Sequence, residues 1–254
     1  TPLIPPLSMS NWDGCRLQNL KTGSKKRFSG TWITVVGGKI LSMESIKLIM
    51  SGCMEIDKPL ISILMAVYEP KIEWLREQLL SLNAQTYPHL QLYVRDDCSS
   101  AVSFEEIQSC VQDCISAFPV IISRNEKNLG SNKTFERLTT EAVGEYFAYC
   151  DQDDVWLPEK LERLQTILSS EKAVLACSDV FVIGREGQVQ AKSITQVRPH
   201  HRFLSGDALT DSLIYRNFVI GCTMLMDASV AKQACPFPET MVHDHFLAFY
   251  ASTK

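Results

Sequence analysis

The sequence predicts an α/β protein with a doubly wound, mainly parallel sheet and helices on both of its faces. Apolar, strand-like runs alternate with amphipathic, helix-like segments from about residue 59 onward. The first run, PLISILMAVY at 59–68, is almost continuously apolar, as in a strand that is covered on both faces. Strands and helices that alternate in this way form crossover units, which place successive strands parallel to one another.

Each element is predicted from its own pattern. After the first strand, Ile72, Leu75, Leu79 and Leu82 recur at helical spacing and predict a helix within 72–87. The alternation then continues to about residue 170 and becomes less regular beyond it. Later strands are predicted within 90–97, 119–128, 145–150, 173–191 (with a hairpin around Gly184 and Gly187) and 218–227, and later helices within 104–118, 131–143, 157–170 and 242–252.

Residues 1–53 differ from the rest of the chain. They are first Pro-rich and then basic with Gly and Ser, and neither part has sustained periodicity. We therefore expect an N-terminal extension at 1–53 that is poorly ordered or not part of the fold. A single domain is expected at 54–254.

The composition is that of an ordinary globular protein, with 45% hydrophobic and 21% charged residues in 254. A net charge of −4 gives no support for binding nucleic acid, so no such partner is expected. The nine cysteines lie mostly in apolar runs and form no CxxC pair, which predicts reduced, buried thiols in a cytoplasmic protein. No stretch reaches the roughly 20 uncharged apolar residues of a membrane span.

Polar clusters follow three of the predicted strands. They are Tyr68-Glu69, Asp96-Asp97 and the segment 151–154, DQDD. In an open parallel sheet, ligands bind beyond the carboxyl ends of the strands. One carboxylate of DQDD is explained as a cap for the helix that Pro158 begins, whereas the others require a cation or ligand hydroxyls to offset their repulsion. The sequence thus predicts an acidic cleft that attracts a divalent cation and the hydroxyls of a sugar.

Six motifs, in order, carry a resemblance to a known family. They are PLISILMAVYEP, QTYPHLQLYVRDDCS, NEKNLGSNKTFERL, YFAYCDQDDVWLPEKL, GCTMLM and HDHFLA. Together, over roughly residues 59–250, they resemble glycosyltransferase family 2, and more narrowly its bacterial rhamnosyltransferase-like members. The resemblance implies the GT-A fold, a nucleotide-binding α/β sheet with a smaller acceptor-side portion. The domain is C-terminally short beside such relatives, which usually continue with further helices.

The resemblance also implies residues that bind the nucleotide. Ala66 and Tyr68 would line the base pocket, with Tyr68 packing on a pyrimidine, and Asp97 would accept the ring N–H. Lys133 would reach a phosphate. Three of these residues have a structural alternative: Tyr68 as a strand-end aromatic, Asp97 as an Asx-turn residue, and Lys133 on an exposed helix face. Asp96 we interpret as structural, holding its loop.

Metal binding and catalysis are implied in the same way. Asp151 and Asp153 would form the DXD pair that holds the ribose and the Mg²⁺ or Mn²⁺ bridging the diphosphate, with Asp154 in support. The alternative for this pair is a solvated turn with a helix cap. Asp244 would be the general base. Its neighbours His243 and His245 could ligate a metal, but positions i and i+2 of a helix point to different faces.

The implied function is metal-dependent, inverting transfer of a sugar from dTDP-rhamnose or a UDP-hexose. The acceptor would be the hydroxyl of a saccharide or lipid-linked saccharide in bacterial surface-polysaccharide synthesis. Such a protein is expected in the cytoplasm or at the cytoplasmic face of the inner membrane. One alternative is a truncated, inactive module that binds the nucleotide sugar. A second is a metal-dependent nucleotidyl- or phosphotransferase, although VYEPKIEW lacks the Gly-rich phosphate loop that such enzymes would show.

Overall fold

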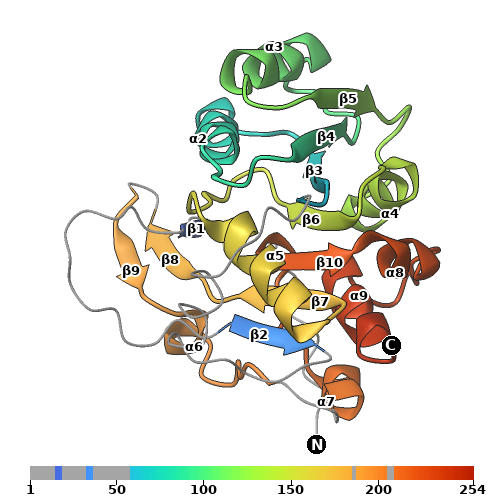
Figure 1. Cartoon of the computed structure of the whole chain (residues 1–254). Helices are drawn as coiled ribbons and strands as arrows, with labels where there is room; N and C mark the ends of the chain where they lie inside the picture. Colours follow the sequence, from blue (N-terminus) through green and yellow to red (C-terminus); the bar gives the residue numbers. More distant parts are fainter. Residues whose placement is uncertain (1–14, 19–32, 37–57, 185–186, 205–208) are drawn as a thin grey trace, which may run out of the picture.

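The computed structural model describes residues 15–18, 33–36, 58–184, 187–204 and 209–254. At its centre is a seven-stranded sheet in the order β2-β7-β10-β6-β3-β4-β5 (Figure 1). The strands are β2 (Ile33–Val36), β3 (Ile61–Val67), β4 (Leu90–Asp96), β5 (Val120–Arg124), β6 (Tyr146–Cys150), β7 (Leu175–Ser178) and β10 (Met224–Asp227).

Four neighbouring strands of this sheet, β6, β3, β4 and β5, are parallel to one another. β10 runs antiparallel to both β6 and β7, and β2 runs antiparallel to β7. The predicted α/β class with a mainly parallel sheet is therefore confirmed.

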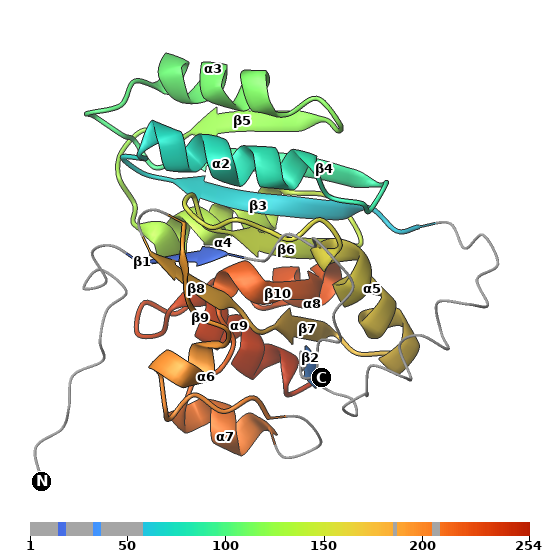
Figure 2. The same ribbon diagram turned by 90° about the vertical axis from the view of Figure 1, so that its left-hand side faces the viewer.

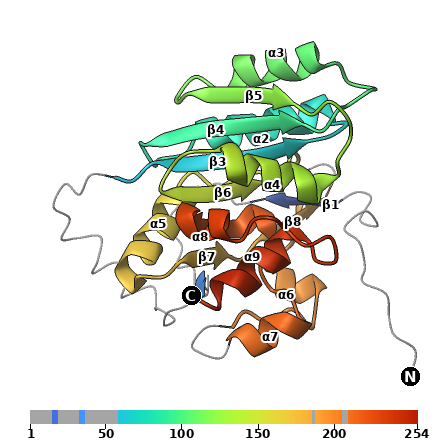
Figure 3. The same cartoon turned by 90° about the vertical axis from the view of Figure 1, so that its right-hand side faces the viewer.

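Helices cover both faces of the sheet, as predicted. On one face lie α2 (Ile72–Asn83), α3 (Phe104–Cys114) and α5 (Lys160–Glu171), which Figure 2 shows in front of the sheet. On the other lie α4 (Ser131–Glu141), α7 (Leu209–Tyr215), α8 (Ala228–Gln233) and α9 (His243–Ala251), of which Figure 3 shows α4, α8 and α9 in front.

The central strand β3 explains why its sequence is almost continuously apolar. Ile61, Ile63 and Met65 belong to the core cluster with α2, α3 and α5, whereas Leu64 belongs to the cluster on the opposite face. All four side chains are fully buried. Because successive side chains of a strand point to opposite faces, a strand covered on both sides is apolar at most positions, and the buried Ser62 donates its hydroxyl to Val143 O.

A smaller antiparallel sheet adjoins the main one. It has the order β1-β8-β9, formed by β1 (Cys15–Gln18), β8 (Phe181–Gly184) and β9 (Val189–Ala191). Gly187, in the β8–β9 turn, has a φ of +80°, which favours glycine, and the predicted hairpin is present. The short α6 (Ile194–Val197) and the 3₁₀ turn η2 (Gly221–Thr223) complete the described elements.

Within residues 1–53, which the sequence led us to expect as poorly ordered or not part of the fold, the structure describes two short strands. β1 pairs with β8, and β2 pairs with β7 at the end of the main sheet. A strand of four residues is too short to produce a recognisable period, which explains why the sequence pattern did not reveal either one. The remainder of residues 1–53 lies outside the described residues, and whether the region can be removed stays a prediction.

The seven cysteines among the described side chains are free, and five of them are buried. The expectation of buried, unpaired thiols therefore holds for five of these seven, whereas Cys98 and Cys235 are free but partly exposed. In the described parts of the chain, no helix has the length and apolar character that a membrane crossing requires.

Candidate functional site

The carboxyl ends of β3, β4 and β6 meet at one edge of the sheet. Val67 is paired with Asp96, and Met65 with Cys150, so the segments that follow these strands leave the sheet together. The loop after β3 is tied to the one after β6, because Tyr68 N donates to Gln152 Oε1 at 2.8 Å and Gln152 Nε2 donates to Tyr68 O at 3.0 Å. Gln152, which was not singled out from the sequence, therefore holds the Tyr68 loop against the DQDD segment.

Tyr68 keeps 47% of its surface exposed at this edge. Ala66, two residues earlier on β3, is partly buried against the core cluster that includes Tyr149 and Phe135. An exposed aromatic ring beside an acidic segment offers a flat surface for stacking a planar group. The base-pocket role of both residues stays a prediction.

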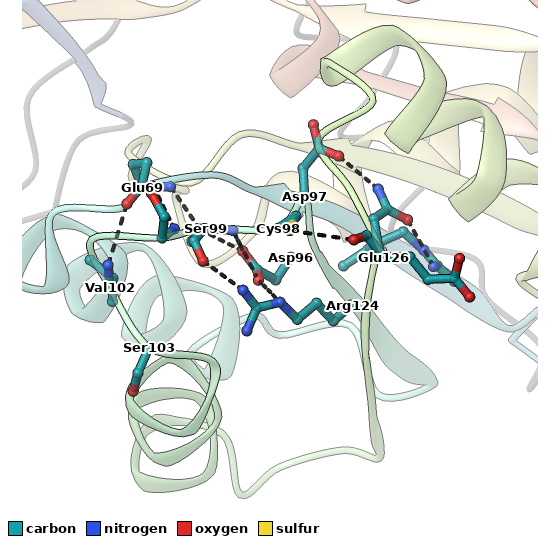
Figure 4. Close-up of polar contacts among 12 residues, drawn as sticks. Glu69, Asp96, Asp97, Cys98, Ser99, Val102, Ser103, Arg124 and Glu126 are labelled. Carbon is teal, nitrogen blue, oxygen red and sulfur yellow. Dashed lines mark hydrogen bonds and ion pairs between the residues drawn. The ribbon is translucent and has the colours of Figure 1, made fainter.

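Asp96 is fully buried, and its contacts hold its loop, as the sequence predicted (Figure 4). Its carboxylate accepts hydrogen bonds from Ser99 N at 3.1 Å and Ser99 Oγ at 2.5 Å. It also pairs with Arg124 Nε at 3.2 Å, and Arg124 in turn donates to Ser99 O at 2.6 Å. These contacts fix the turn from which Asp97 projects.

Asp97 holds the loop before α4. Its Oδ1 accepts from Asn125 Nδ2 and from Leu129 N, both at 2.8 Å, and its Oδ2 accepts from Gly130 N at 2.8 Å. Only 3% of its surface is exposed. Since a carboxylate has about four acceptor positions, one position on Oδ2 is left for a further donor. Asp97 therefore holds the loop before α4, a role that differs from the Asx turn that the sequence offered as its alternative, and its recognition of a base stays a prediction.

Glu69 is likewise hydrogen-bonded into a loop instead of facing an open acidic cleft. It has a φ of 44°, and its carboxylate accepts from Ser100 N at 2.6 Å, Ser100 Oγ at 2.9 Å, Ala101 N and Val102 N (Figure 4). The bond from Ser100 N, with the others, lowers the pKa of Glu69 below its ordinary value. Two of the three predicted acidic clusters thus serve mainly to hold loops.

The third cluster has the strongest mutual repulsion. Burial raises the pKa of Asp151 well above its ordinary value, and the charges of Asp154, Asp153 and Asp244 raise it further. Asp151, Asp154 and Cys222 have their possible ligand atoms within 4.8 Å of one another. The structure therefore groups Asp154 with Asp151, where the sequence predicted Asp153. Asp154 is only 5% exposed, and Asp153 is partly exposed yet close enough to affect Asp151.

Lys160, at the start of α5, is a buried cation that the sequence reasoning missed. It is 6% exposed, donates to the carbonyl oxygen of Cys222, and lies 3.2 Å from the ring centroid of Trp156. Burial lowers its pKa to about 8, against the opposing effect of Asp154 and Asp151. The signal was present in the sequence, because Lys160 occupies the apolar face of its helix beside Leu161 and Leu164. The acidic segment therefore has a buried lysine amino group beside it.

The acidic group fits a hard divalent cation through its carboxylates. Oxygen ligands suit Mg²⁺ and Mn²⁺, so Asp151 and Asp154 are appropriate donors. Burial raises the pKa of the Cys222 thiol well above its ordinary value, and a protonated sulfur is a poor ligand for a hard ion. Of the three grouped residues, Asp151 and Asp154 therefore fit a divalent cation and Cys222 does not.

Asp244 lies in the first turn of α9, and 7% of it is exposed. Its Oδ1 accepts from Asn217 Nδ2 at 3.1 Å and from His245 N at 2.6 Å, and its Oδ2 accepts from Gly221 N at 3.1 Å. As in Asp97, these contacts leave one acceptor position on Oδ2. Its donor Gly221 precedes Cys222, whose sulfur lies within 4.8 Å of the ligand atoms of Asp151 and Asp154, so Asp244 lies near the acidic segment. Catalysis by Asp244 stays a prediction.

The two histidines beside Asp244 point to different faces of α9, as expected. His243 stacks on Phe135 with 4.1 Å between ring centroids, and burial lowers its pKa. His245 Nε2 contacts the carbonyl oxygen of Leu213 on α7. Neither belongs to the possible metal-binding group found among the described residues.

Lys133 has a local partner. Its ammonium pairs with Glu136 on the same helix at 3.1 Å. This contact agrees with the alternative reading of Lys133 as a helix-surface residue, and reaching a phosphate would require the pair to separate.

An open, mainly parallel sheet with aspartates beyond the carboxyl ends of its strands defines an α/β protein that binds its ligand at that edge. The chain belongs to glycosyltransferase family 2, because the model described as "Glycosyl transferase family 2" matches residues 62–233. Among solved structures, S. aureus TarS is similar with a TM-score of 0.56 and 19% identity over 76% of this chain and 33% of TarS. That likeness shows the GT-A fold.

Two curated relatives are informative. TuaG of Bacillus subtilis, whose name assigns it to teichuronic acid biosynthesis, is 24% identical, covering 66% of this chain and 62% of TuaG. The dTDP-rhamnosyl transferase RfbG of Shigella flexneri is 27% identical, covering 75% of this chain and 65% of RfbG. The chain spans 46 to 62% of the length of the first relatives that it matches.

Proposed function

We propose that the chain is the donor-binding and catalytic domain of an enzyme that transfers a sugar from a nucleotide sugar to an acceptor hydroxyl. Family membership supports the reaction class. The observation that carries the proposal is the tie between Tyr68 and Gln152, which joins an exposed aromatic ring to the acidic segment at one edge of the sheet. A site for a nucleotide sugar needs an aromatic surface on which the base stacks, and it needs oxygen ligands for the metal that binds the diphosphate.

The donor class proposed is dTDP-rhamnose or a UDP-hexose, used in the synthesis of a bacterial surface polysaccharide. The names of RfbG and TuaG support this class and pathway, and a TarS structure is titled as a complex with UDP-GlcNAc. The base would pack on Tyr68 beside Ala66. Its ring N–H would donate to the remaining acceptor position of Asp97, a carboxylate already fixed by three loop donors.

Metal binding is proposed at the acidic segment. Asp151 and Asp153 would hold Mg²⁺ or Mn²⁺, with Asp154 and the buried Lys160 supporting them. When bound, the cation neutralises charge on the leaving diphosphate. Because Asp151 is destabilised in its charged form by burial and by three neighbouring carboxylates, a cation there would relieve repulsion that the chain otherwise carries.

Asp244 is proposed as the general base of an inverting transfer. The acceptor hydroxyl loses its proton as its oxygen attacks the sugar, and the free position on Oδ2 would accept that proton. Asn217 Nδ2 and Gly221 N hold the carboxylate in one orientation. Gly221 suits this close approach, because a Cβ there would lie 3.1 Å from His243 Nε2 and 3.6 Å from Asp244 Cβ.

The test is the release of nucleotide from nucleotide sugars. With Mn²⁺ present, we expect the chain to release UDP or dTDP from at least one of UDP-glucose, UDP-GlcNAc and dTDP-rhamnose, faster when an acceptor is added. Nucleotide binding without release would favour the inactive module. Formation of a nucleoside monophosphate or of pyrophosphate would favour a nucleotidyl- or phosphotransferase. A lipid-linked acceptor would bring the protein to the cytoplasmic face of the inner membrane, which stays a prediction.

A further inference from the structure

A cleft lies beside helix α7, lined by residues that belong to none of the three predicted acidic clusters. Its volume is about 580 Å³, and it lies between the segment after α6, helix α7, and the segment that follows α7. Tyr215, at the end of α7, is 83% exposed, the largest exposed fraction among the described large hydrophobic side chains. Leu204, which also lines the cleft, is 39% exposed, so the cleft presents an aromatic and an aliphatic side chain to solvent together.

The lining of this cleft is basic. Among the described residues it includes His200, Arg202 and Arg216, all exposed, and one acidic side chain, Asp211. Within the part of the chain that the structure describes, neither Arg202 nor Arg216 forms an ion pair. Guanidinium groups bind phosphate and carboxylate groups with two parallel hydrogen bonds. The cleft is therefore suited to an anion, whereas the donor site is acidic.

One residue connects the cleft to the proposed catalytic centre. Asn217 lines the cleft and also donates a hydrogen bond to Asp244 Oδ1 at 3.1 Å. A molecule bound beside Tyr215 and Arg216 thus lies next to the side chain that orients Asp244. A site for the acceptor must have this relation to the base, because the acceptor's hydroxyl delivers its proton there.

We propose that this cleft binds the acceptor and selects acceptors that carry a negative group, phosphate or carboxylate, beside the sugar that receives the transfer. Arg202 and Arg216 bind the anionic group. Tyr215 offers its flat, largely apolar face to a sugar ring, and its hydroxyl to a polar neighbour. The assignment of the cleft to the acceptor rests on the proposed function.

The experiment compares three monosaccharides that differ only at C6, titrated into the ¹⁵N-labelled chain and followed by NMR without any donor. They are methyl α-glucoside, its 6-phosphate and the corresponding methyl glucuronide. We expect at least one anionic probe to bind about tenfold more tightly than the neutral one, with shifts at Tyr215, Arg216 and Asn217. Arg202→Gln and Arg216→Gln should each reduce that preference several-fold. Arg163→Gln, an exposed arginine on α5 outside the cleft, should leave it unchanged.

The two anionic probes separate phosphate from carboxylate recognition. Equal affinity for all three sugars, or the same loss from Arg163→Gln as from Arg216→Gln, would overturn the proposal. A loss of nucleotide affinity in Arg202→Gln or Arg216→Gln would also overturn it, because these arginines would then belong to the donor site. Binding of UDP or dTDP is measured separately for each variant, so a failed donor site is recognised independently of the sugar titrations.

Discussion

Asp153 and Asp154 are neighbours in the chain, but the structure gives them different surroundings. Asp154 is 5% exposed and grouped with Cys222, while Asp153 remains partly exposed at the edge of the sheet. A diphosphate arrives from solvent, so its metal needs ligands that face the opening. We therefore expect the buried carboxylate of Asp154, near the cation Lys160, to act mainly on the stability of the segment, although its oxygens could also serve as ligands.

These surroundings predict different defects for two matched substitutions. Asp153→Asn should weaken Mn²⁺ binding in the presence of UDP or dTDP by about tenfold or more, with the melting temperature of the free protein nearly unchanged. Asp154→Asn should lower the melting temperature of the free protein. Calorimetric titration with Mn²⁺ and thermal unfolding of both variants measure the two defects. If Asp154→Asn lost Mn²⁺ affinity and Asp153→Asn did not, Asp154 would be the principal ligand.

Asp244→Asn keeps the shape of the side chain and removes the charge that accepts a proton. A base acts on the acceptor's proton alone, so we expect turnover to fall by roughly 10²-fold or more, while donor affinity changes by less than about threefold. Steady-state kinetics and nucleotide titration measure the two effects. Turnover at the wild-type rate would remove Asp244 from the mechanism and direct attention to His243 and His245.

Single carboxylates show what the sequence could predict at this scale. The positions of Asp97 and Glu69 after predicted strands followed from the pattern, and both do lie at the sheet edge. Their hydrogen-bond partners, Gly130 and Ser100, are about thirty residues away in the chain. These long-range contacts determine which acceptor positions of the two carboxylates are occupied. The local sequence therefore could not predict them.

Among the elements, the loop before α3 depends on one acidic side chain. Glu69 accepts hydrogen bonds from three successive backbone amides, Ser100 to Val102, and they lower its pKa below the ordinary 4.5. A depressed carboxyl pKa in the folded state stabilises the protein above the unfolded pKa, and this contribution is lost as the pH falls through the folded pKa. Glu69→Gln should therefore lower the melting temperature at pH 7, and the difference from wild type should shrink below about pH 4.5.

Thermal unfolding of both proteins from pH 3 to pH 8 measures that difference. Glu105→Gln, on the first turn of α3, is a control, because Glu105 is an exposed acid of the same region. A difference that stays constant with pH would show that the carboxylate's charge contributes nothing to holding the loop.

The N-terminal strands give a prediction for a whole segment. The described core clusters are built from residues 61 onward, and β1 and β2 have four residues each. We expect a chain that begins at Met54 to fold and to melt within a few degrees of the full chain. The shortened chain lacks β2, so the edge of β7 that pairs with β2 would be open. An insoluble or much less stable product would contradict the prediction and show that β2 is an integral strand of the sheet.

Element length explains which parts of the fold were predictable. Between residues 59 and 170, helices of 11 or 12 residues alternate with strands of 5 to 7, and the sequence predicted each of them. The helices α6, α7 and α8 have four, seven and six residues. Such helices span two turns at most, which is too short for a hydrophobic period to be distinguished from chance.

At the scale of the whole molecule, the site is composite. Tyr68 follows β3, Asp97 follows β4, and Asp151 follows β6. Asp244 lies in the first turn of α9, about 175 residues after Tyr68 in the chain. The order of parallel strands predicted that the first three would meet. The approach of Asp244 depends on η2 and α9 packing against the sheet, which the loosened pattern after residue 170 did not specify.

The central claim is that nucleotide and metal bind together at this composite edge. The most direct measurement is the rise in melting temperature caused by UDP or dTDP, with Mn²⁺ and with EDTA, since a ligand of the folded state stabilises it by mass action. We predict a much larger rise with Mn²⁺. Asp151→Asn should abolish the difference, and Asp113→Asn, an exposed acid at the C-terminal end of α3, should preserve it. Equal stabilisation in EDTA, or an undiminished difference in Asp151→Asn, would contradict the claim.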